Sequence, residues 1–439
     1  MRRQCAIQEL QNEVALREKV NLIGEFSFQE STWDTVVEWL DRAPTNVYGL
    51  FRAIAFGSSG ALACLLLLGF ASVITWTHLA FWIWGLLLLN GALGLSYRAR
   101  LLDSMQAIRG LSLEIGILRE GLSLLQVQQF RSALLTELVV SARDSNAGVN
   151  LRKLERLAAT MTERNKEWFY AISRALLVGT QTFLAIEKWR TQHGRSLREW
   201  LRAWGEFESL LALAGYAYEH PGNTFPQLSR DRTMLEAKGL GHPLLPVATC
   251  VLNDVSLNEY VKFYVISGSN MAGKSTLLRA IGLNAVLAYA GAPVVAKEMT
   301  LSRFAICASL THQDSLLSGK SKFLVEMERV KLALTVAKDQ GPVLFLFDEI
   351  LAGTNSIDRR SVAEAIIRAL VERGALGALS THDLALTELG SSVELSGTNM
   401  HMASNNDWDP LNFNYVLKPG PTTQSSALAI AKLAGVFST

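Results

Sequence analysis

The sequence contains one long stretch without Asp, Glu, Lys or Arg, from Ala53 to Tyr97. A helix of about 45 residues would be roughly 68 Å long at ~1.5 Å per residue. This length is enough for two crossings of a ~30 Å hydrocarbon core and too long for one. We therefore expect a two-helix transmembrane hairpin over residues 53–97 that turns near Thr75 to His78. The alternative is a buried hairpin in a large soluble helical domain, although soluble helices rarely go so long without a charge.

Basic residues flank this stretch on both sides, namely Arg42, Arg52, Arg98 and Arg100. Because Lys and Arg are concentrated in cytoplasmic segments, both flanks are expected in the cytoplasm, with only a short turn outside. The tryptophans Trp76, Trp82 and Trp84 suit the membrane–water interface. The predicted location is therefore the cell membrane, with two crossings.

Composition restricts the remaining possibilities. Lys and Arg number 42 and Asp and Glu 40, so no global basic excess indicates a nucleic-acid binder, and any DNA contact has to come from a local patch. The cysteines Cys5, Cys64, Cys250 and Cys307 lack CxxC or Cys/His spacing. This pattern favours a reducing compartment and argues against a structural zinc site.

Apolar residues recur at helical spacing on both sides of the hairpin. Residues 1–50 read as the start of a helical core domain, and residues 98–220 as long helices packed in a bundle or lever. Their charged positions fit a solvated face better than a basic stripe. Residues 221–235 read as a linker, since two prolines and a glycine lie in EHPGNTFPQLSR. From residue 236 onward, short apolar runs alternate with helical ones, as in a parallel α/β sheet.

A phosphate-binding loop is predicted after the strand candidate at residues 262–266. The pattern G-x-x-x-x-G-K-S stands between this strand and a helical run, where backbone N–H groups and the helix N-terminus can face phosphates. Lys274 would place its charge on the β- and γ-phosphates, and Ser275 would ligate Mg²⁺. The expected nucleotide-binding residues are Gly268, Ser269, Asn270, Met271, Ala272, Gly273, Lys274, Ser275 and Thr276.

Two acids end the apolar run at residues 343–347 and complete such a site. Asp348 is suited to hold Mg²⁺, directly or through water, and Glu349 could polarise the attacking water as general base. His382 follows another small apolar run and could sense the γ-phosphate. The predicted chemistry is Mg-dependent ATP hydrolysis, with ATP and Mg²⁺ as ligands and Glu349, His382 and Lys274 as the catalytic group.

With these residues in place, the carboxy-terminal part resembles the MutS family of mismatch-repair ATPases. The matching stretches are GHPLL (241–245), Asn253-Asp254, SGSNMAGKSTLLRAIGLN (267–284), GKSKFLVEMERV (319–330), LFDEILAGTNSIDR (346–359), STHDL (380–384) and FNYVLKPGPTTQSSALAIAKLAGV (413–436). The resemblance implies an ABC-type P-loop α/β ATPase domain over residues 236–439. Upstream, RQCAIQEL and WLRAWGEFESLLALAGYAYEHP are similar to the opening of the family's core domain and the end of its lever.

The resemblance also implies an ATPase that forms a homodimer, with each ATP between two subunits. Ser321 would reach the partner's γ-phosphate from a helix N-terminus, and Ser318 is the second candidate for that role. Thr354, Asn355 and Ser356 would form the loop that crosses the interface, and Val251 and Asn253 fall where the family places its adenine-contacting segment.

Our interpretation is a membrane-anchored MutS-like ATPase whose all-α core and lever are interrupted by the hairpin. Its partners would be a second copy, the lipid bilayer and mismatched or branched DNA, in repair or recombination. The sequence leaves no room ahead of residue 1 for a mismatch-reading domain, so direct mismatch recognition is in question. The alternative is an ATP-driven envelope component that couples to a protein partner without DNA; a small-molecule kinase fits poorly, because it leaves the FLVEM and AGTNSID segments unexplained.

Overall fold

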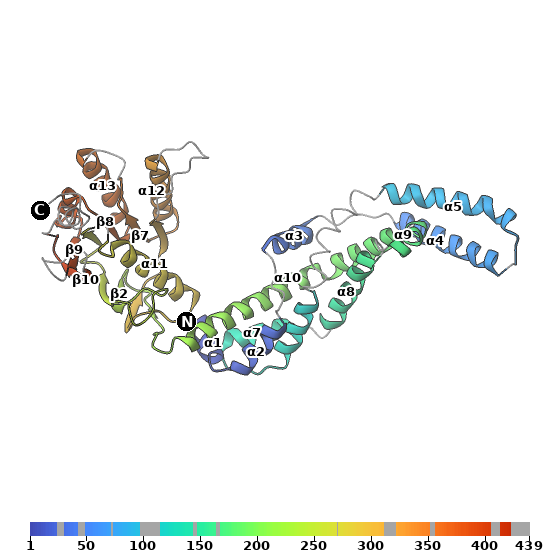
Figure 1. Cartoon of the computed structure of the whole chain (residues 1–439), viewed down its shortest axis with the longest axis horizontal. Helices are drawn as coiled ribbons and strands as arrows, with labels where there is room; N and C mark the ends of the chain where they lie inside the picture. The colour runs from blue at the N-terminus through green and yellow to red at the C-terminus, as the bar shows by residue number, and fades with distance from the viewer. Residues whose placement is uncertain are drawn as a thin grey trace, which may run out of the picture. The chain divides into compact units, whose positions relative to one another are not determined.

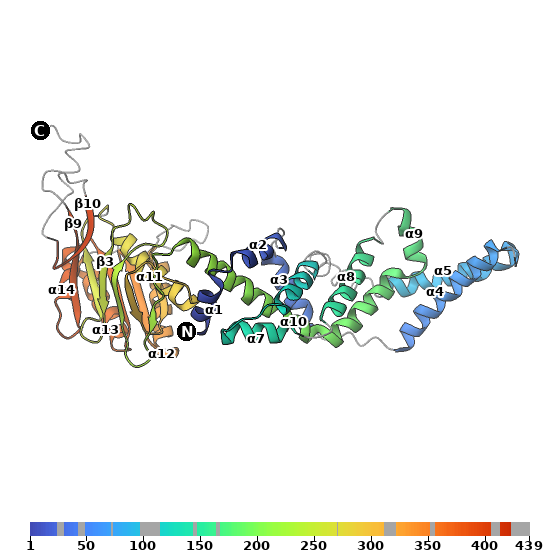
Figure 2. The ribbon, with the colours of Figure 1, turned by 90° about the horizontal axis from the view of Figure 1, so that it is seen from below.

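The chain has a helical amino-terminal region followed by an α/β domain with mixed sheets (Figures 1 and 2). The structure is a computed structural model that describes residues 1–23, 30–42, 49–71, 73–96, 115–143, 147–163, 167–269, 271–310, 322–351, 356–404 and 413–422. Two compact units are present, one formed by Glu9–Ala212 and the other by Met1–Gln8 with Leu213–Thr439.

The helical unit contains amphipathic helices around a core rich in tryptophan. Two of its helices are apolar and are described below. The others, of which α1 and α10 lie only partly in this unit, are α1 (Arg2–Leu10), α2 (Val14–Ile23), α3 (Glu30–Asp41), α7 (Ala133–Ala142), α8 (Ala147–Glu163), α9 (Glu167–Ala175) and α10 (Val178–Glu219). Trp189, Trp200 and Trp204 on α10 are almost completely buried. α10 is the longest helix among the described residues, with 42 residues. At a rise of ~1.5 Å per residue it is about 63 Å long.

Ionic contacts position the ends of these helices. The Glu9 carboxylate accepts hydrogen bonds from the backbone N–H groups of Arg131 (2.6 Å) and Ser132 (2.8 Å), at the N-terminus of α7. A negative charge is favourable there because the helix dipole and the unpaired N–H groups both face it. Buried Arg190 pairs with Glu187 at 2.8 Å and donates to the carbonyl of Trp39 at 2.9 Å, which ties α3 to α10.

Two further helices of this unit are apolar, α4 (Gly49–Phe70) and α5 (Trp76–Ser96), and they pack against each other as a hairpin. Both are long and apolar enough to cross a membrane, over Ala53–Phe70 and Trp76–Leu95. Only 28% and 11% of these windows are buried, whereas the core helix of a soluble protein would be mostly buried. α4 ends at Phe70 and α5 begins at Trp76, slightly before the expected turn, so His78 is already in the first turn of α5.

The α/β unit contains two sheets. The six-stranded sheet has the order β10-β9-β4-β8-β7-β6, in which β10 is antiparallel to β9 and the other pairs are parallel. Its strands are β4 (Phe263–Ser267), β6 (Ala305–Ser309), β7 (Val343–Asp348), β8 (Leu376–Thr381), β9 (Gly397–Ser404) and β10 (Phe413–Pro419). The smaller sheet has the order β1-β5-β2-β3, with strands β1 (Gln227–Leu228), β2 (Leu235–Leu240), β3 (Asn253–Leu257) and β5 (Glu298–Leu301).

Helices cover both faces of the larger sheet (Figure 1). α11 (Lys274–Ala290) packs on one face, where its Leu278 and Ile281 share a core with Leu346 of β7. α12 (Lys322–Asp339) and α13 (Ser356–Val371) pack on the other face, against Phe345 and Phe347. The short helices η1 (Leu384–Leu386) and α14 (Thr387–Gly390) follow β8. β4, β7 and β8 are consequently buried on both faces, which explains their nearly continuous apolar sequences.

Residues at both ends of the helical region contribute to the α/β unit. The Arg3 side chain donates to the carbonyl of Ala290 at 2.7 Å, and Gln4 donates to that of Pro226 at 2.8 Å. Within the range 221–235, expected as a linker, Thr224 bridges to Val294 and β1 pairs with β5. Most of that range is therefore part of the α/β unit.

The central strand β8 provides a test of this packing. A Cβ atom at Gly377 would collide with the backbone carbonyl of Phe345 on β7, which cannot rotate away. We expect Gly377→Ala to lower the free energy of unfolding by about 1–3 kcal/mol, measured by thermal or denaturant unfolding. Gly222→Ala is the control, because a Cβ there meets nothing within 4 Å. Equal stability of the two variants would contradict this account.

Candidate nucleotide-binding site

Strand register brings the predicted site residues to one edge of the sheet. Ser267, the last residue of β4, pairs with Thr381 of β8, and Asp348, the last of β7, pairs with Ser380. Because these strands are parallel, the loop after β4, the Asp348-Glu349 pair and His382 all follow carboxyl ends of neighbouring strands. Ligands of open α/β sheets bind at this edge.

The loop between β4 and α11 uses glycine where other residues would not fit. Gly273 has a φ of 93°, in the left-handed region, and a Cβ there would lie 2.9 Å from the Cδ1 atom of Tyr415. Glycine thus permits both the turn into α11 and the close approach of β10. The N-terminus of the helix then faces the loop, where unpaired N–H groups favour an anion.

Lys274 is folded onto its own loop. Its ammonium donates to the carbonyls of Gly268 (2.7 Å) and Ser269 (2.8 Å), and the residue is 2% exposed. Burial lowers the pKa of Lys274, and the nearby charges of Glu349 and Asp348 oppose part of this shift. Backbone carbonyls of the loop thus hold the lysine ammonium at the loop.

Ser380 connects the two acids. Its hydroxyl donates to Asp348 Oδ1, and both its hydroxyl and its carbonyl oxygens lie 3.2 Å from the backbone N–H of Glu349, which donates to them. Glu349 has a φ of 52°, which is uncommon for a residue with a side chain and costs of order 1–3 kcal/mol. The completely buried Ser380 stabilises this unfavourable backbone conformation and fixes the Asp348 carboxylate.

His382 faces the second acid. Its Nδ1 lies 3.3 Å from Glu349 Oε1, with the imidazole about half exposed and the carboxylate less so. Behind them, Arg359 pairs with Asp383 at 3.2 Å and donates to the carbonyl of Leu351 at 3.0 Å. The segment after β7 is therefore attached to the segment after β8, so that Glu349 and His382 are positioned together.

A cavity of about 450 Å³ opens beside the loop. It is lined by Leu240, His242, Leu245, Thr249, Cys250, Val251, Asn253, Met271, Gly273, Ser275, Thr276, Leu277, Ala280, Met402 and Tyr415. Loop residues thus share one cavity with Val251 and Asn253, which the resemblance places near adenine. Its volume lies within the range typical of small-molecule sites.

The Asn253 side chain forms hydrogen bonds with β10 beside this cavity. Its amide nitrogen donates to the carbonyl of Tyr415 (3.0 Å), and its amide oxygen accepts from the N–H of Leu417 (2.7 Å). Both ends of the amide are thus used to hold β10 against the first residue of β3. The Tyr415 ring, which lines the cavity, depends on this attachment.

Several predicted residues lie outside the described part of the chain. They are Asn270 of the loop, Ser318 and Ser321, and Thr354 and Asn355; Ser356 begins α13, but its side chain is not described. The roles predicted for these residues remain predictions.

The described residues fit a nucleotide with Mg²⁺. The Ser269 hydroxyl oxygen is buried and has no hydrogen-bond partner among the described residues, so it can meet a polar ligand group. Asp348 and Ser275 offer the oxygen ligands that Mg²⁺ prefers. Among the described residues, no group of three or more His, Cys, Asp or Glu side chains is arranged so that it could hold a metal ion by itself.

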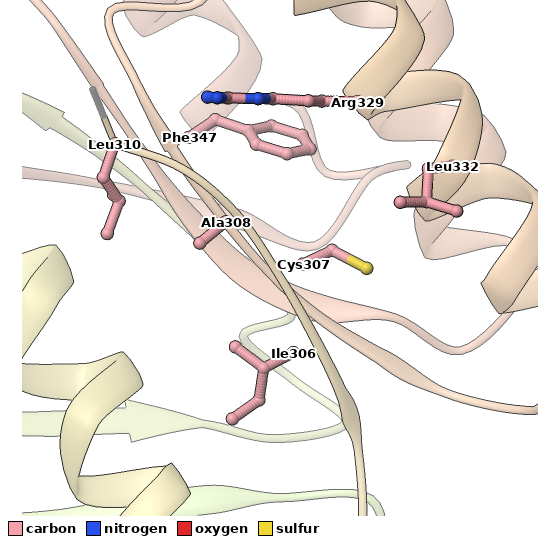
Figure 3. Close-up of a pocket in the computed structure, with 7 residues that line it drawn as sticks. All are labelled: Ile306, Cys307, Ala308, Leu310, Arg329, Leu332 and Phe347. Carbon is pink, nitrogen blue, oxygen red and sulfur yellow. The ribbon is translucent and has the colours of Figure 1, made fainter. Parts of the chain in front are cut away.

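A second cavity, of about 520 Å³, lies elsewhere in the same unit, beside the edge strand β6 (Figure 3). It is lined by Ile306, Cys307, Ala308, Leu310, Arg329, Leu332 and Phe347. Burial raises the pKa of the Cys307 thiol, which keeps it protonated. None of these residues lines the first cavity.

Comparison with known proteins shows which family this part of the chain resembles. The sequence model of MutS domain V matches residues 264–439, which contain the loop, both acids and β10. The chain is 34% identical to the DNA mismatch repair protein MutS of Thermus caldophilus over 279 residues, and 36% identical to that of Lactobacillus delbrueckii subsp. bulgaricus over 212 residues. Residues 264–439 of the chain belong to the MutS domain V family.

The match to MutS proteins is partial in both directions. The Thermus caldophilus alignment covers 63% of this chain and 33% of the relative, and the Lactobacillus alignment covers 47% and 24%. The chain thus spans about a third of the length of the Thermus MutS proteins that it matches. The shared part is centred on domain V.

Two residues that shape the MutS-type site were not singled out by the sequence. Ser380 lies within the STHDL stretch, but its bonds to Asp348 and Glu349 depend on strand register. Tyr415 lies within the closing stretch, and only the fold places its ring at the cavity. A small polar residue opposite the first acid, and an aromatic residue in the last strand, are the signals that could have indicated them.

Removing the Asn253 amide tests the attachment of β10. Asn253→Ala leaves the carbonyl of Tyr415 and the N–H of Leu417 without their partner, which costs about 1–3 kcal/mol of unfolding free energy. We also expect weaker binding of fluorescent ADP, measured by anisotropy, because the Tyr415 wall is loosened. Asn253→Asp keeps the acceptor for Leu417 but sets a carboxylate oxygen against the carbonyl of Tyr415, so we expect it to be at least as destabilising as the alanine variant. An unchanged Asn253→Ala variant would exclude this role.

Proposed function

We propose that this chain is an ATPase whose binding and hydrolysis of ATP drive movement of the helical region, and that a membrane hairpin anchors it. The observation that carries the proposal is the convergence of the loop, Lys274, Asp348 and Glu349 on one sheet edge, beside the cavity of about 450 Å³. ATP would place its phosphates at the N-terminus of α11 and its base in that cavity, against Tyr415. An aromatic ring is well suited to pack on a purine.

The proposed roles follow from the contacts of each side chain. On nucleotide binding, Lys274 would exchange the carbonyls of Gly268 and Ser269 for phosphate oxygens, which are stronger partners for an ammonium. Asp348 and Ser275 would hold Mg²⁺, which supplies charge neutralisation of the phosphates when bound. Glu349, oriented by Ser380 and His382, would accept a proton from the attacking water.

Dimer formation would complete the site. We propose that Ser321, or Ser318 in its place, meets the γ-phosphate bound by a second copy, and that Thr354, Asn355 and Ser356 lie at the interface. The support for this arrangement is the match to MutS domain V. ATP would then stabilise the closed dimer, and hydrolysis would release it.

The hairpin of α4 and α5 would place the ATPase domain at the cytoplasmic face of the cell membrane. Its support is the charge-free run, the low burial of both apolar helices and the exposed rings of Phe81, Trp82 and Trp84. Large exposed aromatic residues are unfavourable in water and favourable in lipid.

DNA is the proposed target, because the relatives are named DNA mismatch repair proteins. The test is ATP turnover by the detergent-solubilised chain with perfect, mismatched and branched duplexes over a salt series. We expect one DNA form to stimulate turnover, with an effect that falls steeply as salt rises, because phosphate contacts release counterions. ATP turnover that is unchanged by every DNA form would overturn the DNA role. It would favour the alternative, an envelope component that couples to a protein partner.

The catalytic role of Glu349 has its own test. Glu349→Gln keeps the size of the side chain but removes the base, so we expect hydrolysis to slow by about 10²–10⁴-fold while ATP still binds. Single-turnover hydrolysis and ATP retention on a filter measure the two steps separately. Glu372→Gln, an exposed acid after α13, serves as the control. Normal turnover of the Glu349→Gln variant would show that another group acts as the general base.

A further inference from the structure

The junction between α9 and α10 is an abrupt break in helical structure. Leu176 and Leu177 form a turn between the two helices, and Leu177 has a φ of 54°, which is rare for a residue with a branched side chain. We call residues 167–186, which comprise α9, this turn and the beginning of α10, the elbow. No glycine or proline lies at the turn itself, so its conformation has to be stabilised by neighbouring groups.

Those neighbours are polar side chains of the apolar hairpin. Asn90 of α5 is 1% exposed and donates to the carbonyl of Ala175 at 2.8 Å. Ser59 of α4 donates to the carbonyl of Leu176 at 2.9 Å. The amide oxygen of Asn90 accepts from Ser58 at 2.7 Å, so the polar groups satisfy one another.

These bonds attach the elbow partway along the hairpin. Beyond Ser59, α4 continues for about 11 residues to Phe70, roughly 16 Å, and α5 needs about 14 residues from Trp76 to Asn90, roughly 21 Å. Neither length reaches the ~30 Å of a hydrocarbon core. A hairpin that crosses the bilayer therefore has to carry Ser59, Asn90 and the attached elbow below the membrane surface.

The elbow has the composition that this position requires. The elbow begins at the charged Glu167; from Trp168 to Ile186 Arg174 is the single charged residue, and charges resume at Glu187 and Lys188. Tyr170 and Ile172 on α9 are about half exposed. The Arg174 guanidinium donates to the Tyr170 hydroxyl at 3.2 Å, and a long arginine side chain can reach the headgroups from a shallow position.

We propose that the elbow is a third membrane-embedded element, with α9 facing lipid acyl chains and the turn sealed by the hairpin. Irregular backbone is tolerated at membrane depth only where its polar groups are satisfied by protein, and Ser59 and Asn90 supply that here. The inference rests on the proposed membrane anchoring and extends it, because the beginning of α10 is then held within the bilayer.

Depth-dependent fluorescence quenching tests this proposal on the full chain. In a background with all four native cysteines replaced, single cysteines are introduced at exposed positions: Ile172→Cys in the elbow, Leu67→Cys near the hairpin tip and Val149→Cys on α8 as the aqueous control. Each is labelled with bimane and reconstituted in phosphatidylcholine and phosphatidylglycerol vesicles that carry nitroxide on the acyl chains. ATP turnover of each labelled protein confirms that it is folded.

We expect the Ile172→Cys and Leu67→Cys probes both to be quenched at least twofold more than the Val149→Cys probe. Quenching at Leu67→Cys alone, with Ile172→Cys equal to the control, would overturn the embedded elbow and leave membrane anchoring intact. If neither probe is quenched above the control, the membrane anchoring itself fails and the elbow proposal fails with it.

Discussion

The parallel pairing of β4 with β8, and of β8 with β7, is the constraint on which the site depends. It places Ser267 opposite Thr381 and Asp348 opposite Ser380, so that segments far apart in the sequence end together. A shift of one residue in β8 would turn its side chains to the other face and separate Ser380 from Asp348. The close contact of Gly377 with Phe345 supports the pairing of β8 with β7, because a larger side chain cannot be accommodated there.

Sequence reasoning predicted those parts of the structure that depend on local pattern. The expected strand at residues 262–266 is β4 shifted by one residue, and the apolar run before Asp348 is β7. The loop glycines and Lys274 are recognisable because their spacing has a local meaning. The sequence also predicted an α/β domain after a helical region, because the spacing of the apolar residues changes between the two. The resemblance to the MutS family was correct.

The features that the sequence did not predict depend on contacts between residues far apart in the chain. The bonds of Ser380 to Asp348, of Asn253 to β10 and of Asn90 to Ala175 join positions that no periodicity relates. The break at Leu177 also lacked a local signal, because leucine favours helix and neither glycine nor proline interrupts the run there. The sequence predicted long helices here without indicating where one ends and the next begins, and the contacts of Ser59 and Asn90 stabilise the turn between α9 and α10.

The attachment of β10 to Asn253 has a consequence for the order of events during synthesis. The cavity needs Met402 and Tyr415, so the nucleotide site cannot close before the last described strand has left the ribosome. The apolar hairpin emerges roughly 320 residues earlier, which corresponds to about 15–60 s at usual elongation rates. With the membrane anchor and ATPase proposed above, nascent chains would be able to engage lipid well before they can hold a nucleotide, so their delivery to the bilayer would need no energy from their own ATPase.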